Sequence, residues 1–222
     1  MVAVGLRWTL APCAGALRVL HSRVMDHSLF FLINQGWANP VLDKLFIWIT
    51  LWWGFGVPVG LMMLTVFRRR WRREGTLLWI FLVLVLLVGE AGGRVIKLAV
   101  AQPRPCYEMP EEVRQPDQPA DKPCGNGLGG MPPNHALDYF AGATLVAATL
   151  RSRRWTLVCF AVAALAALSR IYLGKHYPSQ ALVGACLGVM WGLAAAAIAK
   201  KKLHLEENEY GGATPLTHGT GH

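Results

Sequence analysis

Among the basic residues of this sequence, five lie at the ends of apolar segments and have side chains that can bind or transfer a phosphoryl group. They are Lys97, Arg104, His135, Arg170 and His176. Arginine and lysine bind and neutralise phosphoryl oxygens, and a neutral imidazole can attack phosphorus. A second imidazole can protonate the departing oxygen and then activate water. The sequence has no cluster of Cys, His and carboxylate residues at metal-ligand spacing, so we expect this chemistry to use no metal.

Taken singly, each of these residues has a simpler explanation. A lone histidine near a membrane surface is usually an interfacial polar group, and a lone arginine is usually a snorkelling anchor. Glu90 and Arg94 lie one helical turn apart in the apolar segment before Lys97. Ionisable groups inside a membrane usually mark function, but this pair can simply neutralise itself, and we interpret it as structural. The joint occurrence of all five basic residues at the ends of three apolar segments favours a shared anion site.

The segments that must position these residues are long apolar blocks, which are typical of membrane spans. Hydrophobic residues make up 54% of the 222 residues. We predict an all-α, polytopic membrane helix bundle with five or six transmembrane helices. The five clear spans are residues 45–67, 77–100, 136–150, 155–173 and 181–199. The third is short enough to need help from its flanks.

The remaining residues divide the chain into three regions. Residues 1–27 contain a possible sixth span, but Arg7, Pro12 and Arg18 interrupt it, so we expect an interfacial segment or a leader. Residues 28–202 form the membrane domain, in which residues 28–39 can lie along the surface before the first span. Residues 203–222 are polar and rich in Gly and Thr, and we expect a disordered cytoplasmic tail.

The basic clusters predict the orientation of the spans. They comprise residues 68–73, 151–154 and 200–202. Five alternating spans place all three clusters on one face, and short loops this basic stay cytoplasmic. Topology and anionic lipid explain the net charge of +9 better than nucleic acid, for which there is no motif. The expected location is a bacterial inner (cytoplasmic) membrane, with residues 101–134 facing the periplasm or cell exterior.

That outer segment contains Cys106 and Cys124, the only cysteines outside apolar surroundings. An oxidising compartment would allow them to form a disulfide, and the alternative is two unpaired thiols.

Three motifs in this sequence resemble the signatures of the type 2 phosphatidic acid phosphatase superfamily. The first is Lys97 followed by Arg104-Pro105, the second is Pro132-Pro-Asn-His135, and the third is Ser169-Arg170 followed by His176. They occur in the order of the family and on the expected outer face. The resemblance covers about residues 28–200.

The resemblance implies a compact helical bundle that dephosphorylates a lipid phosphate without metal or cofactor. Lys97, Arg104 and Arg170 would hold the phosphate and stabilise the transition state. His176 would be the nucleophile that forms a phosphohistidine. His135 would protonate the leaving oxygen and later activate water.

The chain departs from the family pattern at three positions. Pro133 stands where the family has a serine, and proline offers neither a hydroxyl nor a backbone donor. Asn134 replaces a glycine, and its amide could supply the missing donor to the phosphate. Gln180 replaces the acid that orients the nucleophilic imidazole; its carbonyl can accept the imidazole N–H but carries no charge. Asp138 is a possible substitute carboxylate, although satisfying backbone donors at the helix start is its more ordinary role.

Two functions therefore remain open. The first is hydrolysis of a phosphate monoester or diphosphate on a membrane lipid, with undecaprenyl diphosphate as the leading substrate. Phosphatidylglycerophosphate, phosphatidic acid and lipid A phosphate are the next candidate substrates. The second is a catalytically weak or inactive member of the family that binds or transports lipid phosphates. The retained histidines and cations favour the enzyme, whereas Pro133 and Gln180 favour the binder. In both, the partners are a lipid phosphate and the bilayer.

Overall fold

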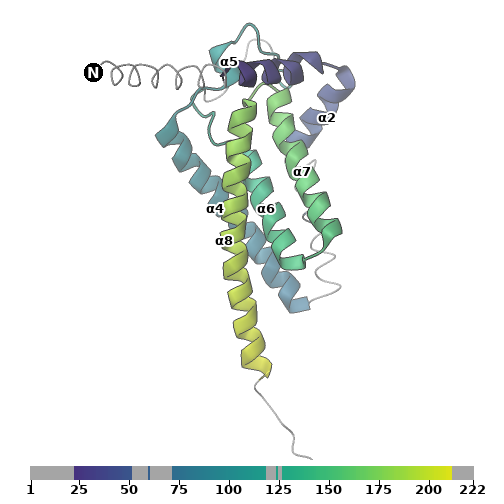
Figure 1. The fold of residues 1–222 in the computed structure, drawn as a ribbon, viewed down its shortest axis with the longest axis vertical. Coiled ribbons are helices and arrows are strands. Elements are labelled where there is room, and N and C mark those ends of the chain that lie inside the picture. Colours follow the sequence, from purple (N-terminus) through teal and green to yellow (C-terminus); the bar gives the residue numbers. More distant parts are fainter. Residues whose placement is uncertain (1–22, 52–59, 61–71, 119–123, 125–126, 212–222) are drawn as a thin grey trace, which may run out of the picture.

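The regular elements of the protein are helices throughout the residues that the structure describes (Figure 1). The computed structural model describes residues 23–51, 60, 72–118, 124 and 127–211, with only the backbone described for 72–77 and 202–211. The elements are η1 (Leu32–Gly36), α2 (Pro40–Thr50), α4 (Arg72–Val100), α5 (Pro105–Glu108), α6 (Asn134–Leu150), α7 (Arg153–Tyr172) and α8 (Pro178–Gly211).

Three helical stretches are long and apolar enough to cross a membrane: Leu78–Glu108, Arg153–Tyr172 and Pro178–Lys201. They correspond to the second, fourth and fifth predicted spans. The prediction of an all-α, polytopic membrane bundle is confirmed. α6, the counterpart of the short third span, has 17 residues. The first predicted span begins within α2, and most of its remainder lies outside the described residues.

α6 occupies the centre of the bundle, in contact with α4, α7 and α8. Gly188 and Gly192, one turn apart on α8, allow the two backbones to approach closely. A Cβ at Gly188 would lie 2.3 Å from the carbonyl oxygen of Leu137, and one at Gly192 would lie 2.5 Å from that of Ala141. Small residues drive helix association in membranes because close backbones gain van der Waals contacts that lipid cannot replace. This packing fixes the start of α6 relative to the start of α8.

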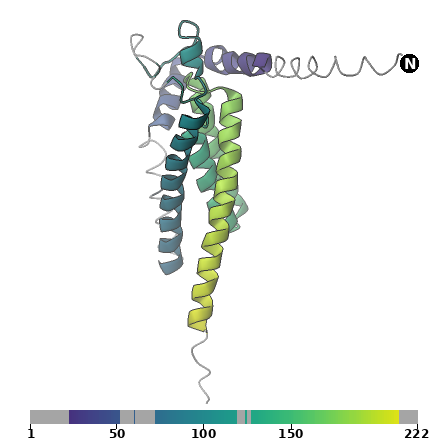
Figure 2. The same ribbon diagram turned by 90° about the vertical axis from the view of Figure 1, so that its left-hand side faces the viewer.

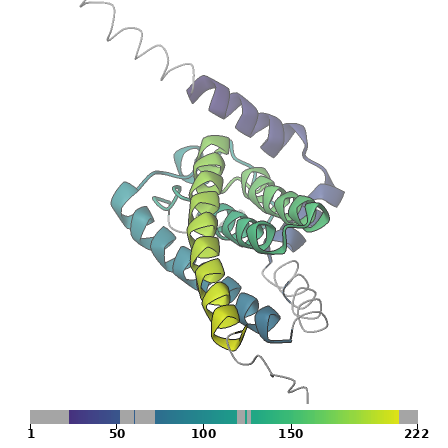
Figure 3. The ribbon, with the colours of Figure 1, turned by 60° about the horizontal axis from the view of Figure 1, so that its bottom comes forward.

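The long α8 also contacts α4, which crosses behind it in Figure 3, and α7. The helix continues past Lys202 to Gly211. Here the structure differs from the expected disordered tail at 203–222, because residues 203–211 are helical and only 212–222 lie outside the described residues. Extending an existing helix avoids the cost of nucleation, and the Leu and Glu residues of this segment are good helix formers.

A helix formed by residues 23–31 and η1 lies across one end of the bundle, nearly perpendicular to α8 (Figures 1 and 2). Asp26 accepts hydrogen bonds from the backbone N–H and the hydroxyl of Ser179, at 2.8 and 2.5 Å, and so caps the first turn of α8. Asn34 donates to the carbonyl oxygen of Tyr172 at 2.7 Å. The transverse helix thus ties together the end of α7 and the start of α8. Residues 1–22 lie outside the described residues.

Candidate active site

The turn between α7 and α8 buries two basic side chains. Gly174 has a φ of 74°, in the left-handed region, and a Cβ there would lie 2.5 Å from Cγ1 of Val113. Only glycine suits both this backbone conformation and this space. The two residues that follow, Lys175 and His176, are 4% and 3% exposed. The turn therefore directs both side chains into the interior of the protein.

The hydrogen bonds of His176 define its tautomer. Its Nδ1 lies 2.8 Å from the carbonyl oxygen of Gly130 and 3.4 Å from Oε1 of Gln180. Both partners are oxygen acceptors, so Nδ1 carries the proton and donates it. In the neutral ring, Nε2 then keeps its lone pair, which is the state a nucleophile requires.

Three cations from three helix ends act on this imidazole. Arg170 lies in the last turn of α7, Lys97 in the last turn of α4, and Arg104 immediately before α5. Burial holds the pKa of His176 well below its usual range, and the positive charges of Arg170 and Arg104 lower it further. Lys97 acts in the same direction with a smaller effect. The structure brings these three predicted phosphate ligands together around a neutral histidine.

Two of the cations have donors without a protein partner. The Nε atoms of Arg104 and Arg170 are buried and make no hydrogen bond to any residue that the structure describes. Buried charged donors are normally paired, so such atoms indicate a place for an anion. Phosphate oxygens are the acceptors that suit a guanidinium best.

His135 lies in the first turn of α6, close enough to Arg170, Lys97 and Arg104 to feel their charges. The structure thus places both predicted catalytic histidines beside one cation cluster. α6 delivers His135 and the α7–α8 turn delivers His176, and the glycine contacts of α6 with α8 hold these elements together.

Asn134 is placed differently from the predicted phosphate donor. Its Nδ2 donates to Oε2 of Glu90 at 2.6 Å and to the backbone oxygen of Glu90 at 3.3 Å. Gly93 makes room for this contact, since a Cβ there would lie 2.4 Å from Oδ1 of Asn134. The amide donors are therefore engaged by α4 and are not available to a phosphate in this arrangement. Glu90 also pairs with Arg94 at 2.9 Å, in line with a structural role for that pair.

Asp138 does not cap α6, although capping was the more ordinary role expected for it. The residue before the helix is Pro133, and Asp138 lies beyond the first turn. Its carboxylate faces α4, where a Cβ at Gly89 would lie 2.6 Å from Oδ1 of Asp138. This Oδ1 is buried and has no hydrogen-bond partner among the described residues.

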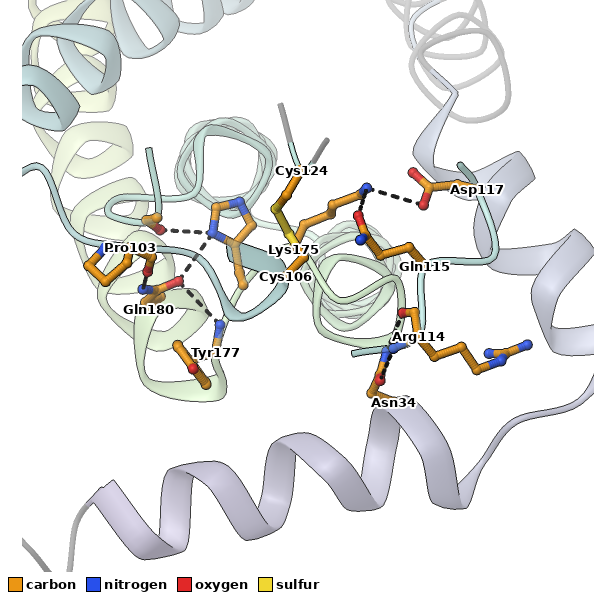
Figure 4. The surroundings of a disulfide bond; sticks show 12 residues. Asn34, Pro103, Cys106, Arg114, Gln115, Asp117, Cys124, Lys175, Tyr177 and Gln180 are labelled. Carbon is orange, nitrogen blue, oxygen red and sulfur yellow. Dashed lines mark hydrogen bonds and ion pairs between the residues drawn. A yellow bond between two sulfur atoms is a disulfide. The ribbon is translucent and has the colours of Figure 1, made fainter. Parts of the chain in front are cut away.

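Described parts of the outer segment between α4 and α6 lie beside Lys175 and Gln180, as Figure 4 shows for Pro103, Gln115 and Asp117. A disulfide joins Cys106 to Cys124, so the pairing left open by the sequence is present in the structure. Lys175 donates to Oε1 of Gln115 at 3.0 Å and forms an ion pair with Asp117 at 3.3 Å. The outer segment thereby supplies the counterion of a buried lysine next to His176.

Sequence reasoning missed Gly130, Gln115 and Asp117. Gly130 acts through its backbone oxygen, which leaves no mark in the side-chain pattern. The glycine-rich run at residues 125–130 was the one available signal, because such runs allow close approach of the backbone. Asp117 lies in a segment without regular periodicity, so its pairing with Lys175 could not be read from spacing.

Comparison with known proteins places this geometry in a family. Residues 76–203 match the model of the PAP2 superfamily. The chain is 30% identical over 162 residues to an undecaprenyl-diphosphatase of Sulfolobus acidocaldarius, an alignment that covers 72% of this chain and 71% of that protein. The family match includes the turn that carries His176.

The fold is also similar to a solved structure. The crystal structure of Aquifex aeolicus LpxE superimposes with a TM-score of 0.59, covering 77% of this chain and 94% of that one at 23% sequence identity. This likeness supports the bundle architecture. With the three motifs gathered at one end of the bundle and the family model spanning more than half of the sequence, the chain belongs to the PAP2 superfamily.

Proposed function

We propose that the protein hydrolyses a phosphate monoester or diphosphate on a membrane lipid through a phosphohistidine intermediate, with undecaprenyl diphosphate as the leading substrate. The observation that carries this proposal is the neutral, buried His176 beside two arginine Nε donors that lack a protein partner. The named activity of the Sulfolobus relative supports the choice of a lipid diphosphate.

The proposed reaction has two steps. Lys97, Arg104 and Arg170 bind the phosphoryl oxygens, and Nε2 of His176 attacks phosphorus while the bond to the leaving oxygen breaks. The bound phosphate offsets the three cations that disfavour the imidazolium of His135. This imidazolium gives its proton to the leaving oxygen and becomes neutral. His135 then takes a proton from water, the hydroxide attacks the phosphohistidine, and inorganic phosphate leaves with His176 neutral again.

The direct test is release of phosphate by the purified protein in detergent. The substrates are undecaprenyl diphosphate, phosphatidylglycerophosphate, phosphatidic acid and lipid A phosphate, with His176→Ala as the matched control. Release that requires His176 supports the proposal, and the best substrate identifies the lipid. Binding of these lipids without release would contradict it.

That contrary result would favour a lipid-phosphate binder or transporter. One specific observation supports this second function. Pro133 is buried before α6 and provides no side-chain cap or donor, while the amide donors of Asn134 are taken by Glu90. The second motif therefore contributes His135 but neither of the donors expected from its neighbours.

The orientation in the membrane is part of the same proposal. The site end holds the Cys106–Cys124 disulfide, and disulfides persist in oxidising compartments. The basic connection between α6 and α7 lies at the opposite end of α7 from His176. Both observations support a site on the face of the membrane opposite the cytoplasm, which in the proposed bacterial inner membrane is the periplasm or cell exterior.

A further inference from the structure

Gln180, which replaces the expected acid, is held by hydrogen bonds in two directions. Its Oε1 accepts from the backbone N–H of Tyr177 at 3.2 Å, and its Nε2 donates to the carbonyl oxygen of Pro103 at 3.0 Å (Figure 4). The side chain is fully buried. Position 180 thus requires one acceptor and one donor, and these two contacts also fix which end of the amide is oxygen.

A carboxylate does not satisfy these contacts. It would place an oxygen where Nε2 of Gln180 now lies, 3.0 Å from the oxygen of Pro103. Two buried acceptors would then face each other, with a net charge and no donor between them. The amide supplies the acceptor and the donor that the two partners need, whereas an ionised carboxylate supplies only acceptors.

The shorter contact of the nucleophile is made by the outer segment. Nδ1 of His176 lies 2.8 Å from the oxygen of Gly130, against 3.4 Å from Oε1 of Gln180. The backbone around Gly130 is itself paired with the segment after α4. The N–H of Gly130 donates to Gln102 at 2.8 Å, and the N–H of Arg104 donates to Gly127 at 2.9 Å.

Gly130 and Gln180 are packed against each other in this arrangement. A Cβ at residue 130 would lie 2.7 Å from Nε2 of Gln180 and 2.5 Å from the oxygen of Pro103. Gln180 therefore connects three parts of the site: the segment at Pro103, the backbone at Tyr177, and the imidazole of His176.

We propose that a neutral pair, the carbonyl of Gly130 and the amide of Gln180, positions the nucleophile of this protein in place of a carboxylate. The carbonyl accepts the Nδ1 proton and leaves Nε2 free for attack. The amide fixes the position of the segment around Pro103 and Gly130 relative to the α7–α8 turn. Both are positioning residues for the reaction, and the inference rests on the proposed function of His176.

The test compares Gln180→Glu and Gln180→Met with the wild-type protein. Gln180→Glu keeps the acceptor for Tyr177 and His176 but loses the donor to Pro103, whereas Gln180→Met loses both. We expect each change to lower kcat and kcat/KM together by about tenfold with KM unchanged, because the lost interaction acts in the transition state. Gln35→Glu is the matched control, since Gln35 donates to the backbone oxygen of Glu112 at 2.7 Å from an exposed position.

A second measurement reports on the resting protein and needs no turnover. Nitrogen NMR of ¹⁵N-histidine-labelled protein, with His176→Ala to assign the signal, should show His176 neutral with the proton on Nδ1. Gln180→Met should mix the two tautomers, and Gln35→Glu should not.

Three results would overturn the inference: a kcat in Gln180→Glu at or above that of the wild type, a proton on Nε2 in the wild type, or an equal loss of activity in Gln35→Glu. Failure of the proposed function looks different. A wild-type protein that releases no phosphate but shows the Nδ1 tautomer would refute the enzyme and retain the positioning of His176.

Discussion

The ammonium nitrogen of Lys175 lies 3.3 Å from a carboxylate oxygen of Asp117, and the two side chains are 5% and 16% exposed. Burial lowers the pKa of Lys175, and the charge of Asp117 partly offsets this effect. The pair joins the outer segment to the residue that precedes His176, so it couples the fold of that segment to the candidate site.

Asp117→Asn should reduce the stability of the protein. The change leaves Lys175 buried without a counterion, which costs about 3 kcal/mol. The double variant Asp117→Asn with Lys175→Met should recover most of the loss, because no unpaired charge remains. The measurement is the Tm in detergent for the two single variants and the double variant. A double variant less stable than Asp117→Asn would refute the coupling.

His176→Ala should abolish the covalent intermediate. Protein mixed with substrate and quenched in alkaline denaturant should carry a phosphoryl adduct that is stable to alkali and labile to acid. His135→Ala should still form the adduct, but slow its formation or its hydrolysis, because the proton donor and the base for water are lost. An active His176→Ala protein would rule out covalent catalysis by this residue.

Formation of the adduct should persist at acid pH. Burial and the nearby arginines hold the pKa of His176 well below its usual range, so the neutral ring survives as the pH falls. Since only the neutral ring has a lone pair at Nε2, the acid limb of adduct formation should have its midpoint below the ordinary histidine pKa of about 6.5. Single-turnover experiments across the acid range measure it. A midpoint at the ordinary value would show that His176 is not buried among cations during the reaction.

Gly130→Ala should impair the site by steric displacement. The added Cβ would lie 2.5 Å from the oxygen of Pro103 and 2.8 Å from that of Gln102, and backbone atoms cannot move aside cheaply. Overpacking of this kind costs about 1–3 kcal/mol and shifts the carbonyl that holds His176. We expect kcat to fall by about tenfold or more. Gly92→Ala on α4 is the matched control, since a Cβ there meets nothing within 4 Å, and it should keep wild-type activity.

The proposed orientation predicts the labelling of introduced cysteines. The background keeps the Cys106–Cys124 disulfide and replaces Cys13, Cys159 and Cys186. A membrane-impermeant reagent should label Gln118→Cys on intact cells, because residue 118 lies in the outer segment. Arg72→Cys, in the basic region before the second predicted span, should be labelled only after permeabilisation. The reverse pattern would invert the topology.

The sequence by itself determined the class of the fold and indicated the residues of the candidate site. A long apolar segment in lipid must satisfy its backbone N–H and C=O groups internally, which a helix does. The hydropathy of the sequence therefore predicts the helix bundle. The motifs that contain Lys97, Arg104, His135, Arg170 and His176 also indicated the family. Residue type and spacing are visible in the sequence, and these types are the ones that bind and transfer phosphoryl groups. The polar composition of residues 203–211 predicts disorder, whereas the structure continues α8 to Gly211, because a helix that already precedes a segment can be extended into it.

Only the tertiary structure decided how these residues are held. Asn134 turned its donors to Glu90 because the register of α6 against α4 sets that contact, and register between distant helices is not encoded in local spacing. The partner of His176 is a backbone oxygen of Gly130, 46 residues earlier in the chain, and every residue carries such an oxygen. Gln180 looked like a loss of charge in the sequence. In the structure it is the side chain whose donor and acceptor match Pro103 and Tyr177, since the demand for both arises from backbone groups that only the folded chain brings together.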